Sequence, residues 1–292
     1  MTSNGEGVNR RNVLKKSAVL GGIGFTTTAG AASAESDEER SAGSGEFRGS
    51  VTLSESDPMS DEELEEYARK EMKKSSPAQT IPPGVVNEVV DSSPISIQAA
   101  SPDDPQQVTL DDTWDTGVEK ITGSFGELGE TRHQVSVYEG DYKSADGDNV
   151  YILWHMSRAD FGHVSHNTKV EKMENYIDLP SDWSLYTYEP QDSVSDGGQD
   201  INVGIGAAKG GGSMSLGTTV TVGGGTVRTT NHTSTGSGSK YELEYQGCTK
   251  GDNGTEIING LSLLTTSDSY ISEYSLDWSY YTKLNTTLNC FY

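Results

Sequence analysis

The sequence is short of positive charge, of apolar residues and of cysteine. Its 292 residues include 21 Lys and Arg against 44 Asp and Glu, which gives a formal net charge of -23. A chain this acidic is a poor partner for nucleic acid, because phosphate contacts require clustered Lys and Arg. Hydrophobic residues make up 32%, below the roughly 45–50% of ordinary globular domains. The chain is therefore either partly disordered or built from Gly-punctuated strands around a modest core.

The first 34 residues contain the three parts of a twin-arginine export signal. Arg10 and Arg11 begin a motif that ends at Lys15, a weakly apolar stretch follows, and Ala32-Ser33-Ala34 forms a small-x-small cleavage site that ends at Ala34. The apolar stretch is too short and too rich in Gly and Thr for a stable membrane span. We therefore expect residues 1–34 to be a signal peptide and the mature protein to be secreted.

The acidic excess extends along the whole mature chain. Cleavage after Ala34 would remove four basic residues and one acidic residue and leave a net charge of -26. Export by this route with such an acidic surface resembles secreted haloarchaeal proteins. In multimolar salt, carboxylates hold water and cations, and the repulsion between them is screened. An acidic exported bacterial protein is the alternative.

Residues 35–105 differ in composition from the rest of the chain. They hold seven of the nine prolines but no Trp, so we expect a flexible linker or pro-segment. Within it, Ser60 and Glu63 form a capping box, and acidic residues precede basic ones along the next three turns. This pattern predicts a helix over about Asp61 to Lys74, either free in the linker or lying as a lid on the main domain.

From residue 106 onward the sequence reads as a single all-β domain, 106–292. It holds all four Trp and 13 of the 14 Tyr, and short strand-like runs alternate with Gly, Asp and Asn. We predict an elongated, antiparallel, β-sandwich-like fold. The predicted strands are Gln134–Tyr138, Asn149–Met156, Ser184–Tyr188, Asp200–Ala207, Met214–Val222, Lys240–Tyr245, Glu256–Leu264 and Tyr270–Tyr281.

The two cysteines, Cys248 and Cys290, predict one disulfide in an oxidising compartment. It would close a loop of about 42 residues and tie down the end of the domain. Two separate buried thiols are the alternative.

The stretch from Ile201 to Val227 is nearly free of charge, with Lys209 as its one ionic residue. Aliphatic residues alternate with Asn, Gly, Ser and Thr on both sides of a Gly-rich turn, which predicts an amphipathic hairpin. A transmembrane β-strand needs about 9–11 residues with this alternation, and its edges must close into a barrel. An ordinary strand pair of the sandwich is the alternative. The candidate membrane-insertion residues are Ile201, Val203, Ile205, Met214, Leu216, Val220 and Val222.

Several segments around this hairpin resemble the stem region of leukocidin-type β-pore-forming toxins. They are Tyr188–Pro190, Ser193–Ser195, Ile201–Gly206 and Gly212–Ser215, and Tyr274–Trp278 is similar to the Tyr-x-x-x-Trp close of that family. The resemblance implies an all-β protein that is secreted as a soluble monomer and inserts one stem hairpin per subunit into an oligomeric pore. The family's aromatic rim for lipid headgroups has no residue-by-residue match here.

Catalytic and metal-binding patterns are weak. His155, Asp160, His163 and His166 are the densest metal-like group, but their spacing fits a surface turn better than a metal site. The sequence contains no nucleophile elbow in a strand-to-helix context. We therefore assign no catalytic residue, metal or cofactor.

Three functions remain open. The first is a secreted, membrane-active protein, pore-forming or halocin-like, whose partners would be a target-cell membrane or envelope and further copies of itself. The second is a secreted or surface-associated adhesion or binding module. The third is a hydrolase, which a loss of activity on substitution of His163 or His166 would support.

Overall fold

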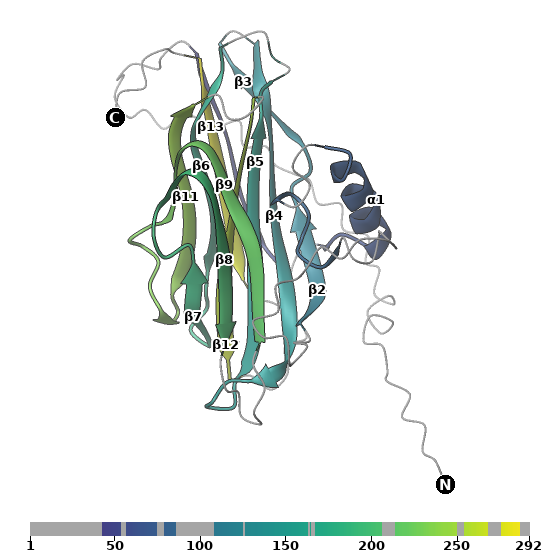
Figure 1. The fold of residues 1–292 in the computed structure, drawn as a ribbon, viewed down its shortest axis with the longest axis vertical. Helices are drawn as coiled ribbons and strands as arrows, with labels where there is room; N and C mark the ends of the chain where they lie inside the picture. Colours follow the sequence, from purple (N-terminus) through teal and green to yellow (C-terminus); the bar gives the residue numbers. More distant parts are fainter. Residues whose placement is uncertain are drawn as a thin grey trace. The chain divides into compact units, whose positions relative to one another are not determined.

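Two antiparallel β-sheets packed face to face make up the fold (Figure 1). The computed structural model describes residues 43–53, 57–74, 79–85, 108–124, 126–162, 164, 167–205, 214–249, 254–267 and 276–286. These residues lie within one unit, Ser41–Tyr292. The arrangement confirms the all-β, sandwich-like fold that the recurring strands predict.

Sheet A has six strands in the order β1-β13-β6-β11-β9-β8. Their bounds are β1 Ser44–Thr52, β13 Asp277–Asn285, β6 Lys169–Asp178, β11 Lys240–Thr249, β9 Met214–Thr229 and β8 Val194–Ile205. Sheet B has the order β10-β7-β12-β5-β4-β2, with β3 paired to β4. Their bounds are β10 Gly236–Ser237, β7 Trp183–Glu189, β12 Thr255–Thr266, β5 Asn149–Asp160, β4 Gly126–Lys143, β2 Val108–Asp115 and β3 Glu119–Gly123.

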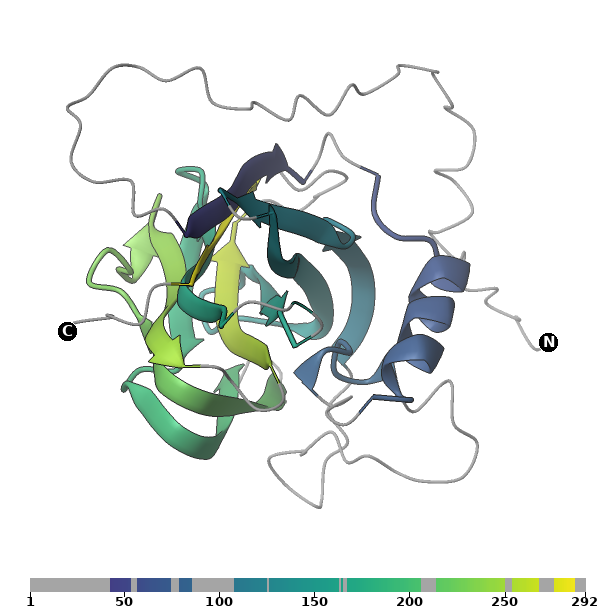
Figure 2. The same cartoon turned by 90° about the horizontal axis from the view of Figure 1, so that it is seen from above.

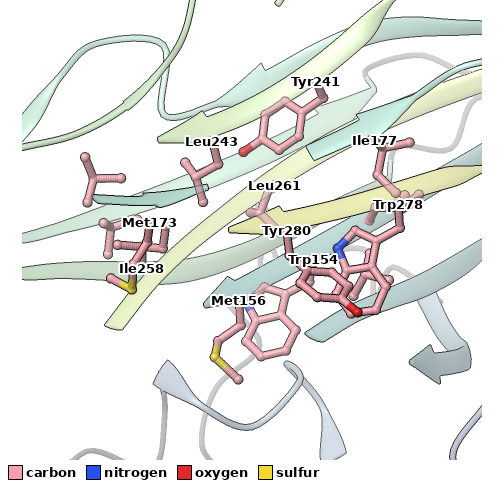
Figure 3. Packing of buried hydrophobic residues seen from close by; sticks show 14 of the residues in the cluster. Trp154, Met156, Met173, Ile177, Tyr241, Leu243, Ile258, Leu261, Trp278 and Tyr280 are labelled. Atoms are coloured by element: carbon pink, nitrogen blue, oxygen red, sulfur yellow. The ribbon is translucent and has the colours of Figure 1, made fainter. Parts of the chain in front are cut away.

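Large side chains from both sheets fill the core between them (Figure 3). Trp154 of β5, Trp278 of β13 and Tyr241 of β11 are among the largest fully buried side chains. Burial of each large apolar side chain contributes about 1.5–3 kcal/mol. A low overall apolar content is therefore compatible with a substantial core, because the apolar residues are concentrated on the inward faces of the strands.

The predicted helix is present as α1, Asp61–Glu71. Its capping box is complete: the Glu63 amide donates to the Ser60 hydroxyl at 3.3 Å, and the Ser60 amide donates to the Glu63 carboxylate at 2.8 Å. The helix lies outside sheet B, beside β2 (Figure 2). Ala68 is buried together with Ile81 and Val85 in a small second apolar cluster.

The start of the folded domain differs from the boundary expected at residue 106. Within the range expected to be a flexible linker, β1 pairs with β13 along its whole length, from Ser44 to Thr52. Phe47 and Val51 of β1 pack against the core. The low apolar content of this range hides the strand, because an edge strand needs only a few inward side chains, and backbone hydrogen bonds hold the rest.

Candidate functional site

The predicted hairpin exists, and it forms one edge of sheet A. β8 is the outermost strand and pairs with β9 from Val194–Val227 to Ile205–Met214 (Figure 1). β9 in turn pairs with β11 only over Thr226–Thr229. Most of the hairpin therefore has no other strand of sheet A beside it within the described part of the chain. We call β8 and β9 together the edge hairpin.

One face of the edge hairpin is apolar and buried. Ile201, Val203, Leu216, Val220 and Val222 are each at most 3% exposed. The two remaining candidates, Ile205 and Met214, are register partners in the same strands.

The opposite face of the hairpin is polar. Asn202 and Thr219 lie next in sequence to buried aliphatic residues and are exposed. The predicted alternation of an apolar and a small polar face is thus present in the folded chain.

The hairpin packs against β12, around an edge that β7 leaves uncovered. β7 pairs with β12 only from Leu261 onward. On one side of β12, the Gly223 amide of β9 donates to Glu256 Oε1 at 3.2 Å. On the other side, Asn259 Nδ2 donates to the Thr219 carbonyl at 3.4 Å. Because side chains three residues apart point to opposite faces of a strand, the two contacts come from opposite faces of β12.

The β12 side chains that bond to the hairpin are polar and buried. Glu256 and Asn259 are each 1% exposed. Asn259 Oδ1 has no hydrogen-bond partner among the described residues. An orphaned acceptor of this kind costs about 1–3 kcal/mol in a buried site. The hairpin is therefore packed less favourably on β12 than an all-apolar interface would allow.

His155 of the candidate metal group lies in β5 and belongs to a buried polar cluster, not to the expected surface turn. His155 Nδ1 lies 3.3 Å from Asn175 Oδ1, and its Nε2 lies 3.0 Å from the Ser262 hydroxyl. Burial lowers the pKa of His155 to about 3. His163 and His166 lie outside the described residues. Among the residues that the structure does describe, no group of three or more His, Cys, Asp or Glu is arranged to hold a metal ion.

A cavity of about 250 Å³ lies between α1 and strands β4 and β5. Its lining includes Arg132 and Arg158, but each is paired with a carboxylate: Arg132 with Asp115 at 2.6 Å, and Arg158 with Glu71 at 3.0 Å. The charges in this cavity are thus largely balanced. The Arg158–Glu71 pair attaches α1 to β5, and the Arg132–Asp115 pair joins β4 to β2, so neither arginine is left to form a site for an anion.

Other predicted residues cannot be placed. Arg10, Arg11 and Ala34 of the export signal lie outside the described residues. Cys248 falls in β11 and Cys290 lies outside the described residues, so the disulfide stays a prediction. In the described part of the chain, no helix combines the length and apolar character needed to cross a membrane.

Sequence reasoning missed the polar residues that bond to the hairpin and the glycines at its base. Glu256 and Asn259 flank the apolar pair Ile257–Ile258 in β12, which could have marked them as buried polar groups with specific partners. The run Gly223–Gly225 interrupts the alternation of β9 and could have indicated a bend in the strand.

Comparison with known proteins gives little further guidance. No protein family and no curated protein matches the chain. Among solved structures, a chain described as a pore forming protein is similar to this one with a TM-score of 0.31 and 7% sequence identity, over 63% of this chain and 92% of that chain. So remote a similarity carries no functional argument, and the geometry of the edge hairpin is what supports a function.

Proposed function

We propose that this protein is exported by the twin-arginine route and acts on cell envelopes by inserting its edge hairpin into a target membrane. Several copies would each contribute one hairpin to a closed β-barrel, because open strand edges are not stable in lipid. The apolar face, with Ile201, Val203 and Val220, would face the lipid. The polar face, with Asn202 and Thr219, would line an aqueous channel.

The observation that carries the proposal is the position of this amphipathic hairpin at the edge of the sandwich. From Ile201 to Val227 it has Lys209 as its one ionic residue. β8 has 12 residues and β9 has 16, and about 9–11 are enough to cross a bilayer. Departure of the whole hairpin would break only the short pairing of β9 with β11 over Thr226–Thr229 and no other strand pairing of sheet A. A central strand pair would have to disrupt the sheet on both sides to do the same.

Dye release from lipid vesicles tests the proposed function. Purified protein is added at high salt to vesicles of archaeal diether phospholipids, and in parallel to vesicles of phosphatidylcholine. We expect dose-dependent release from at least one composition. Binding to vesicles or envelope material without release at any dose would contradict the proposal and favour an adhesion or binding module.

A further inference from the structure

We propose that the two arms of the edge hairpin, Gly198–Ile205 and Met214–Val222, leave the sandwich as one unit about a glycine hinge that spans both strands, released from a clasp formed by Glu256 and Asn259. The membrane role of this motion rests on the proposed function, whereas the motion itself is inferred from the hairpin's geometry.

The hinge lies where β8 and β9 both depart from regular strand geometry, at positions that face each other in the pairing. The register between β8 and β9 shifts between the pairs Ser195–Thr226 and Gly197–Val222. On β8 the shift is at Gly197, with φ 123°. On β9 it is at Gly223–Gly225, where Gly224 has φ 144° and Gly225 has φ 107°. Positive φ values are accessible to glycine at little cost, so both strands can bend here together.

The hinge also lies where the attachment to sheet A ends. The pairing of β9 with β11 begins at Thr226, the residue after the glycines. The base of the hairpin is further held by the Thr229 hydroxyl, which donates to the Pro190 carbonyl at 2.9 Å. The Tyr245 hydroxyl of β11 donates to the Gly224 carbonyl. Apart from each other, β9 contacts β11 and β12, and β8 contacts β12 and β7. The pairing of β9 with β11 is confined to Thr226–Thr229, at the base of the hairpin.

The clasp consists of the two polar contacts from β12. Glu256 accepts the Gly223 amide proton at the hinge, and Asn259 donates to the Thr219 carbonyl in the middle of the arm. Both side chains are buried, one on each face of β12. When the hairpin leaves, they regain hydration, which offsets part of the cost of separating the apolar surfaces. These two residues position the hairpin and do not themselves contact the membrane.

The geometry of Gly197 predicts the direction in which a substitution there would shift the opening of the arms. A Cβ at Gly197 would meet nothing within 4 Å, so Gly197→Ala adds backbone strain without a clash. The strain is present while the strand is bent and is relieved when the strand straightens to regular β geometry. The substitution should therefore favour opening of the arms, by about tenfold.

The neighbouring Gly198 provides the matched control. It lies in the same strand without a positive φ, and a Cβ there would make only ordinary contacts, the nearest at 3.5 Å from the Thr221 hydroxyl. Gly126, with φ 103° and open space, is a second control for strain far from the hinge. Glu256→Gln weakens the clasp, and Glu242→Gln is its control on β11.

Hydrogen exchange of the full chain, followed by mass spectrometry, measures the opening. We expect peptides from both arms to exchange at one common rate, faster than β6 and β11. Gly197→Ala and Glu256→Gln should each raise that rate about tenfold, whereas Gly198→Ala, Gly126→Ala and Glu242→Gln should leave the arms no faster relative to the rest of the domain. Arms that exchange only together with β6 and β11, or an equal effect of Gly197→Ala and Gly198→Ala, would overturn the hinge.

Hydrogen exchange and dye release together test the hinge and the proposed function independently of each other. Arms that open as a unit in a protein that never releases dye would support the hinge and contradict the membrane role. Dye release by a protein whose arms exchange only with the whole sheet would support the membrane role and contradict the hinge.

Discussion

Single polar residues join the two sheets through hydrogen bonds in the middle of the core. Asn175 of β6 donates to the Met156 carbonyl of β5 at 2.9 Å and accepts from Trp278 Nε1 of β13 at 2.9 Å. His133 Nδ1 lies 2.7 Å from the Ser157 hydroxyl, and its ring stacks on that of Tyr280. These partners of His133 are uncharged, as are Asn175 and Ser262 beside His155. Among the described residues that contact them, neither histidine would therefore find a compensating charge when protonated.

The two buried histidines predict a loss of stability in acid. Burial lowers the pKa of both His133 and His155 from 6.5 to about 3. Below pH 6.5 the unfolded chain binds protons at these sites while the folded chain does not, so the free energy of unfolding falls as the pH drops from 6.5 toward 3. The expected slope is about 1.4 kcal/mol per pH unit for each histidine.

Urea unfolding between pH 7 and pH 4 checks this expectation. His133→Gln has one titrating histidine fewer, so its stability should fall less steeply with acid than that of the unchanged protein, by about 1.4 kcal/mol per pH unit. Parallel pH dependences of the two proteins would show that His133 is protonated to the same extent in the folded and unfolded states.

The chemistry of these residues was only partly predictable from sequence. The alternation around the hairpin identified which aliphatic residues face inward, because a strand places every second side chain on one face. The same rule cannot tell which strand lies opposite. His155 therefore grouped in sequence with Asp160, although the fold places it between the sheets, beside Asn175 and Ser262.

Helix α1 shows which features of an element follow from neighbouring residues and which depend on tertiary contacts. Its limits and capping box follow from a few adjacent residues, and sequence predicts them well. Its attachment depends on distant partners. Glu71 is 1% exposed and pairs with Arg158 of β5, and the Arg132 guanidinium lies 4.0 Å from the centre of the Tyr67 ring. A helix that looks marginal by its own sequence is thus held by strand residues 65 and 87 positions further along the chain.

The Glu71–Arg158 pair predicts a large effect from a single substitution. Arg158→Leu would remove one of the two cationic partners of the buried Glu71 carboxylate, which would keep Lys74 at 2.6 Å. Loss of a hydrogen bond to a charged group typically costs about 1.5–3 kcal/mol. Urea unfolding should show this loss, and proteolysis should cut the 57–74 segment sooner. The control is Arg69→Leu in the same helix. Arg69 is exposed and pairs with Glu65, so its loss should cost less than about 1 kcal/mol. Equal costs for both would contradict the proposed anchoring of α1.

Across the whole molecule, the distribution of charge separates the hairpin from the rest of the surface. The domain is strongly acidic, yet Ile201 to Val227 carries almost no charge, and the fold sets this stretch at a sheet edge. Sequence indicated the hairpin and the class of fold. It could not place the hairpin at an edge or on β12, because strand order depends on pairings between segments far apart in the chain.

The central claim is that the edge hairpin lines a membrane channel with its polar face. Ion currents across a planar lipid bilayer test it most directly, with Asn202→Lys compared against Gln191→Lys, an exposed residue before β8. We predict discrete channels whose reversal potential shifts toward anion selectivity in Asn202→Lys and stays unchanged in Gln191→Lys, because only residue 202 would line the channel. The absence of channels, or the same selectivity in both variants, would contradict the claim.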